Sequence, residues 1–71
     1  MTIYRTDRSS NIKNFYFDRM LQQLHVEFKS GAGYIYFGVP EILVREWTRA
    51  PSYGKFFWRY IRDQYPYIRA Y

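Results

Sequence analysis

The chain has 71 residues, enough for one small domain, and 24% of them are aromatic: nine Tyr, six Phe and two Trp. It has no cysteine, which excludes disulfide bonds, thiolate metal sites and cysteine nucleophiles. Its apolar runs are far shorter than the roughly 20 residues that cross a bilayer, so we expect a cytoplasmic protein without a membrane partner.

The net charge of +5 is concentrated towards the end of the sequence. Residues 45–71 hold six basic and two acidic side chains, whereas residues 20–44 hold one basic and two acidic side chains. Such asymmetry indicates an anionic partner, although many small soluble domains are equally basic without one.

The first half of the chain predicts an N-terminal arm followed by strands. Residues 1–8 are polar and charged, and we expect a flexible arm there. From Ile12 the pattern becomes that of a strand, and residues 24–28 then alternate between apolar and polar side chains. Between these two strands lies a connection, under which we expect Met20 and Leu21 to be tucked.

The third strand, residues 34–37, carries aromatic residues on both faces. Tyr34 and Tyr36 share one face, and Ile35 and Phe37 share the other. We interpret the tyrosines as core residues beneath the helices rather than as rings that stack bases. The opposite face, with Tyr16, is then partly apolar: it is either a partner or homodimer surface, or it is covered by the arm or the tail.

Two helical segments follow. The first, from Glu41 to Arg49, has apolar residues at helical spacing, and we expect Glu41 to pair with Arg45. Ser52 is a suitable N-cap for the second segment. The second segment has an apolar face at positions i, i+3, i+4, i+7 and i+8, made of Tyr53, Phe56, Phe57, Tyr60 and Ile61.

These elements predict an α+β fold, a three-stranded antiparallel β-meander packed against two C-terminal α-helices. Residues 9–67 form the domain and residues 68–71 form a C-terminal tail.

Several short elements occur in the order and spacing of the KTSC domain, and the chain resembles that family over residues 9–67. They are Ser9-Ser10-Asn11-Ile12, Phe17-Asp18, Leu24-His25-Val26-Glu27-Phe28, Tyr34-Ile35-Tyr36, Val39-Pro40, Ser52-Tyr53-Gly54-Lys55-Phe56-Phe57 and Tyr65-Pro66. The family occurs at the C-terminus of some lysyl-tRNA synthetases and as small bacterial and phage proteins. The resemblance implies a small α+β domain with no catalytic residues, and the synthetase context suggests RNA binding. Trp58 stands where a smaller polar residue is expected.

The candidate binding site is a basic helix face with one exposed ring. It consists of Arg45, Arg49, Lys55, Trp58, Arg59 and Arg62. Such a face can bind a nucleic acid, because cationic side chains neutralise phosphates and an exposed ring stacks on a base. The alternative interpretation is a solvated helix face without a ligand, whose arginine stems pack on neighbouring rings.

Enzymatic chemistry is disfavoured. His25 and Glu27 lie two apart on one strand, but no third metal ligand is evident, and Ser9 and Ser10 lack a base. We therefore expect no cofactor, no metal and no catalytic residue. The predicted function is a binding module for RNA, a nucleotide or another polyanion; the alternative is a protein interaction or homodimerisation module, including a phage-type accessory protein.

Overall fold

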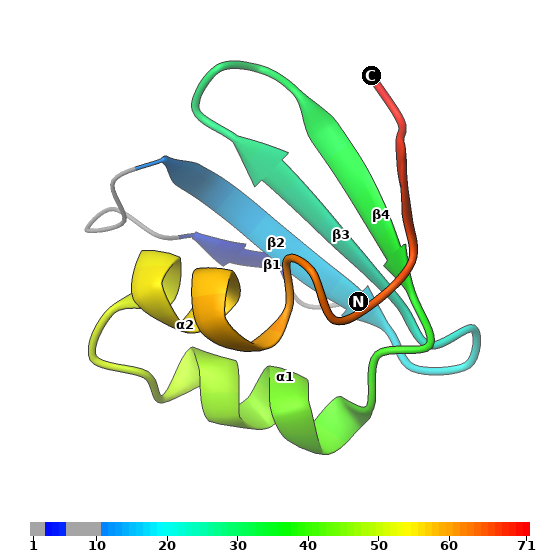
Figure 1. Cartoon of the computed structure of the whole chain (residues 1–71), viewed down its shortest axis with the longest axis vertical. Helices are drawn as coiled ribbons and strands as arrows, with labels where there is room; N and C mark the ends of the chain where they lie inside the picture. Colours follow the sequence, from blue (N-terminus) through cyan, green and yellow to red (C-terminus); the bar gives the residue numbers. More distant parts are fainter. Residues whose placement is uncertain (1–2, 6–10) are drawn as a thin grey trace.

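The computed structural model describes residues 3–5 and 11–71, which form one antiparallel sheet and two helices (Figure 1). The sheet has five strands in the order β1-β2-β3-β4-β5. Both helices pack on the same face of this sheet, here called the inner face, which confirms the predicted α+β class. The elements are β1 (Ile3–Arg5), β2 (Ile12–Asp18), β3 (Gln23–Phe28), β4 (Gly33–Phe37), α1 (Glu41–Thr48), α2 (Tyr53–Tyr60) and β5 (Tyr67–Arg69). Neither helix of the described chain has the length to span a bilayer.

The central strands β2, β3 and β4 form the predicted meander, because short connections return each strand antiparallel to the last. Asp18 shapes the first connection: its Oδ1 accepts hydrogen bonds from the backbone N–H groups of Met20 and Leu21, each at 3.1 Å. This local capping directs the turn into solvent, and Met20 is 95% exposed and Leu21 63% exposed. The prediction that these two side chains lie beneath the connection is therefore wrong.

Two short strands extend the meander at its edges. Strand β1 lies within the segment predicted as an arm and pairs with β2, and β5 pairs with β4. The predicted boundary between domain and tail falls inside β5, after Tyr67. A strand of three residues is too short to show an alternation of apolar and polar side chains in the sequence. Such strands form here because they pair with the open edges of the meander. The remaining arm residues, 1–2 and 6–8, lie outside the described residues, as do Ser9 and Ser10.

The core joins the sheet to the helices through a stacked aromatic pair. Phe15 of β2 and Trp47 of α1 are fully buried, with ring centroids 3.7 Å apart and an interplanar angle of 11°. The indole Nε1 of Trp47 donates a hydrogen bond to the backbone oxygen of Tyr53 at 2.9 Å, which ties α1 to the start of α2. Of the three predicted inward residues of β3, Leu24 and Val26 are buried in the same core, and Phe28 is partly buried and packs against it.

The helices follow their predicted bounds closely, but two predicted side-chain roles are wrong. Glu41 pairs with Arg19 at 2.8 Å rather than with Arg45, because the β2–β3 turn lies against the start of α1. Ser52 caps α2 as expected and accepts the backbone N–H of Lys55 at 3.3 Å. Tyr60, predicted on the buried face, is 44% exposed, since α2 ends there.

The two tryptophans lie in opposite environments, which predicts opposite effects of the same substitution. We expect Trp47→Ala to lower the free energy of unfolding by about 3–5 kcal/mol, because it opens a cavity in the core and removes the Tyr53 hydrogen bond. We expect Trp58→Ala, at a side chain that is 61% exposed, to lower it by no more than about 0.5 kcal/mol. Urea unfolding followed by circular dichroism measures both, and equal losses would contradict the described core.

Candidate nucleic-acid interface

A groove of about 790 Å³ opens between the inner face of the sheet and α2. It runs from the β3–β4 connection, past β4, to the start of β5. Its lining residues are mainly aromatic, polar and basic: Asn11, Phe28, Ser30, Ala32, Tyr34, Tyr36, Ser52, Gly54, Lys55, Phe57, Trp58, Arg62 and Tyr67. None of these residues is acidic, so the groove suits an anionic ligand that carries a ring.

Three tyrosines from neighbouring strands form one wall of the groove. Tyr34 and Tyr36 lie on the inner face of β4, and pairing with β5 places Tyr67 opposite Tyr36. The ring of Tyr67 lies 5.6 Å from that of Tyr34 and 5.3 Å from that of Tyr36, measured between centroids. Tyr36 also packs edge-on against Phe57 of α2, at 5.5 Å, which fixes the depth of the groove.

The other wall belongs to α2 and the turn after it. Lys55, Trp58 and Arg62 are three and four residues apart, so they fall along one stripe of the helix and its continuation. The guanidinium carbon of Arg62 lies 3.7 Å from the ring centroid of Trp58, a cation–π stack. This wall therefore presents two cations on either side of an exposed indole.

The structure brings together three of the six residues predicted for the site. Lys55, Trp58 and Arg62 line the groove, whereas Arg59 lies over the ring of Tyr60, at 5.6 Å. Arg45 and Arg49, at the end of α1, are exposed and outside the groove. Among the described residues, no recorded ion pair involves any of the six predicted side chains.

Two groove tyrosines have roles that sequence analysis assigned differently or missed. Tyr36 is 3% exposed and belongs to the core, as predicted. Tyr34, assigned to the core on the same alternation, is half-buried and also lines the groove. Sequence analysis assigns Tyr67 no role, and no local pattern marks it as a wall residue, because only the pairing of β5 with β4 brings it there.

Burial raises the pKa of Tyr36 to about 12. The nearby phenols of Tyr67 and Tyr34 and the carboxylate of Asp63 add to this effect, and the guanidinium of Arg62 opposes it. The Tyr36 phenol therefore keeps its proton throughout the physiological range. At neutral pH it is an uncharged hydrogen-bonding group with the Arg62 guanidinium and the Asp63 carboxylate nearby.

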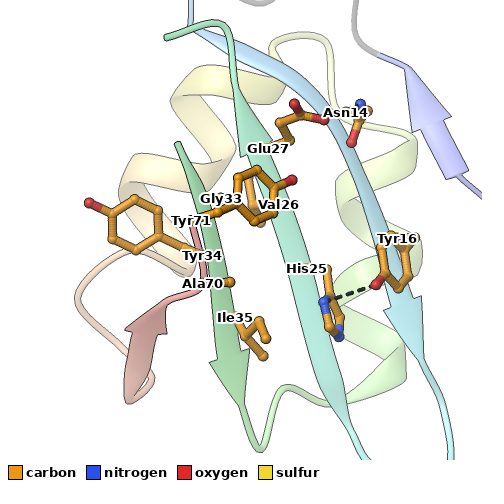
Figure 2. Close-up of a pocket in the computed structure, with 10 residues that line it drawn as sticks. All are labelled: Asn14, Tyr16, His25, Val26, Glu27, Gly33, Tyr34, Ile35, Ala70 and Tyr71. Atoms are coloured by element: carbon orange, nitrogen blue, oxygen red, sulfur yellow. Dashed lines mark hydrogen bonds between the residues drawn. The ribbon is translucent and has the colours of Figure 1, made fainter. Parts of the chain in front are cut away.

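The opposite, outer face holds a small hollow of about 50 Å³ (Figure 2). Tyr16 Oη and His25 Nδ1 are hydrogen-bonded at 3.0 Å there, and burial lowers the pKa of His25 while Asp18 opposes the shift. Glu27 instead accepts a hydrogen bond from Asn14 Nδ2 at 3.0 Å. His25 and Glu27 thus have separate partners, and the described residues contain no group of three or more potential metal ligands.

The C-terminal segment covers part of this outer face. The backbone N–H of Gly33 donates to the oxygen of Tyr71 at 3.0 Å, and Tyr71 reaches over Gly33 in the close-up (Figure 2). A Cβ at position 33 would lie 2.3 Å from the Tyr71 ring, so glycine is what allows this contact. Ile35 and Phe37, the predicted outer-face residues, are half-buried.

The raised pKa of Tyr36 predicts a loss of stability at high pH. Between about pH 10 and pH 12 the unfolded chain loses this proton while the folded state retains it, so the free energy of unfolding falls over that range. Below about pH 10 the phenol is protonated in both states and contributes no pH dependence. Urea unfolding over a pH series should show a shallower decline in Tyr36→Phe than in wild type. The control Tyr71→Phe, which changes an exposed phenol, should keep the wild-type slope, and identical slopes in all three proteins would contradict the assignment.

Comparisons with known proteins show to which family the chain is similar. The family model described as the KTSC domain matches residues 8–65. Lysine–tRNA ligases from Trichormus variabilis and Nostoc sp. are 38% and 40% identical to the chain over 58 residues, which is 82% of this chain and 10% of each ligase. The chain therefore spans about a tenth of the length of these curated relatives.

A solved structure shares the whole fold. The crystal structure of a KTSC domain protein from Yersinia pestis superposes with a TM-score of 0.85 and 28% sequence identity, covering 96% of this chain and 97% of that one. The family model thus covers residues 8–65, and the structural match extends over nearly the whole chain. The chain belongs to the KTSC domain family.

Proposed function

We propose that this domain is a non-catalytic module that binds RNA through the groove between α2 and the inner face of the sheet. The observation that carries the proposal is the wall of α2, where Lys55 and Arg62 flank the exposed ring of Trp58. Cations and an exposed ring together are the two features that bind a phosphate backbone and its bases.

The charge of the groove is available to a ligand. Lys55 and Arg62 are exposed and, in the described part of the chain, take part in no recorded ion pair, so a phosphate would not have to displace a carboxylate from them. Each phosphate that such a side chain neutralises releases condensed counterions from the nucleic acid, which favours binding at low salt. Arg45, Arg49 and Arg59 add positive charge outside the groove and supply long-range attraction.

The rings of the groove supply contacts that a simple basic surface lacks. Trp58 is 61% exposed, and Tyr34 and Tyr67 reach the groove from the sheet. Aromatic stacking contributes about 1–3 kcal/mol for each base. This combination favours RNA or a nucleotide over an inorganic anion, which would use the cations alone.

The names of the relatives are consistent with an RNA ligand. The curated relatives are lysine–tRNA ligases, and this chain is similar to about a tenth of each of them. We carry over neither the ligase reaction nor its amino acid substrate. What we propose for this chain is only contact with RNA.

A protein-interaction or homodimer surface on the outer face, around Ile35 and Phe37, is the second candidate. The observation that favours it is that both helices lie on the inner face, so that within residues 3–5 and 11–71 the outer face has no second layer of helices. The apolar surface exposed to a partner there is reduced, because Tyr71 covers part of this face and Ile35 and Phe37 are half-buried. The groove therefore remains the site that we propose.

Arg62 and Arg59 provide a matched pair for testing the groove, since each is exposed and each lies over a neighbouring ring. We expect Arg62→Ala to weaken binding of a fluorescein-labelled single-stranded RNA and to reduce the slope of log K against log salt by about 0.7, because one phosphate contact is lost. We expect Arg59→Ala, outside the groove, to change affinity less and to leave the slope nearly unchanged.

Fluorescence anisotropy across a salt series measures both quantities. If the two substitutions weaken binding equally, the RNA does not bind in the groove. Binding that does not depend on salt, or no binding to any RNA, would overturn the proposed function.

A further inference from the structure

We propose, building on the function proposed above, that the groove accepts a single unpaired nucleotide of a single-stranded RNA. The base would enter among the rings of Trp58, Tyr34 and Tyr67, and its phosphate would meet Lys55 and Arg62. The domain would then select unpaired RNA, such as loops and free ends, over a continuous duplex.

The first argument is the way the groove presents its rings. Stacking requires access to the flat face of a base, and in a duplex both faces are covered by neighbouring bases. A duplex offers only base edges, sugars and phosphates to a protein. The aromatic walls therefore gain their contacts only from a base that has left the stack.

The second argument is the size of the groove. Its volume of about 790 Å³ lies within the range of roughly 300–1,000 Å³ that is typical of sites for compact small molecules. One nucleotide is a ligand of that kind, whereas a helical duplex would have to rest across the rim. A duplex on the rim would meet the cations but not the tyrosines of β4 and β5.

The third argument is the arrangement around Trp58. The guanidinium of Arg62 already covers one face of the indole at 3.7 Å, yet the side chain as a whole is 61% exposed. The open surface of the indole is thus left for a base, which would extend the stack. Arg62 is held in the groove beside it, where its charge can reach the phosphate of the same nucleotide.

The polar groups of the groove suit the edge of a base rather than a second charge. The Tyr36 phenol, at the bottom of the groove, stays protonated at physiological pH and so offers both a donor and an acceptor. No acidic side chain is among the described lining residues. The groove therefore combines the neutral Tyr36 phenol with cations on one wall, which matches the division of a nucleotide into base and phosphate.

The test compares one labelled RNA sequence as an unstructured single strand and as a blunt duplex with its complement, at the same salt concentration. We expect the single strand to bind at least tenfold more tightly than the duplex. We expect Trp58→Ala to weaken binding of the single strand about tenfold, in line with the loss of one stacked base, and to leave duplex binding unchanged. Arg59→Ala is the control, and it should weaken both RNAs by a similar and smaller factor.

The possible results separate this inference from the proposed function. If the duplex binds as tightly as the single strand, or if Trp58→Ala weakens neither RNA, selection of an unpaired nucleotide is wrong while RNA binding stands. If neither RNA binds, the proposed function itself is wrong. Because Trp58 is exposed, the variant should remain folded, and the buried Trp47 provides an internal fluorescence check of that fold.

Discussion

The stack of Trp47 on Phe15 is the contact on which the rest of the structure depends. It joins α1 to the sheet, and the indole N–H holds the backbone of Tyr53, so one side chain positions both helices. In a chain of 71 residues the core is small, and large buried rings such as Phe15, Trp47 and Phe57 are central to it. The position of α2 over β4 follows from this anchor, because Phe57 of α2 also stacks on Trp47, with ring centroids 5.7 Å apart.

That position of α2 also creates the groove. The helix packs against the sheet through Phe57 and Tyr36, but it ends at Tyr60, and beside the contact the inner face stays open. The aromatic side chains of β4 and β5 and the basic side chains along α2 therefore line the same groove. The aromatic residues thus divide into two groups: buried rings such as Trp47 and Phe15 build the small core, and exposed rings such as Trp58 and Tyr67 line the groove.

Much of the fold could be predicted from the sequence, and the reasons are local. The alternation of Leu24 and Val26 predicted their burial, and Ser52 marked the start of α2. The wrong predictions have two different causes. Glu41 pairs with Arg19 of the β2–β3 turn, a segment distant in the chain, whereas Met20 points into solvent because Asp18 caps the turn locally.

By itself, the sequence determined the burial of Leu24, Val26 and Tyr36, the two helices, the family and the excess of positive charge, because side-chain periodicity, short motifs or composition indicates each of them. Only the tertiary structure decided which cations share a site. Lys55, Trp58 and Arg62 line the same groove as Tyr34 and Tyr67 because β5 adds to the edge of β4 and α2 lies across the sheet. Strand pairing and helix packing create this groove, and no local pattern in the sequence encodes it.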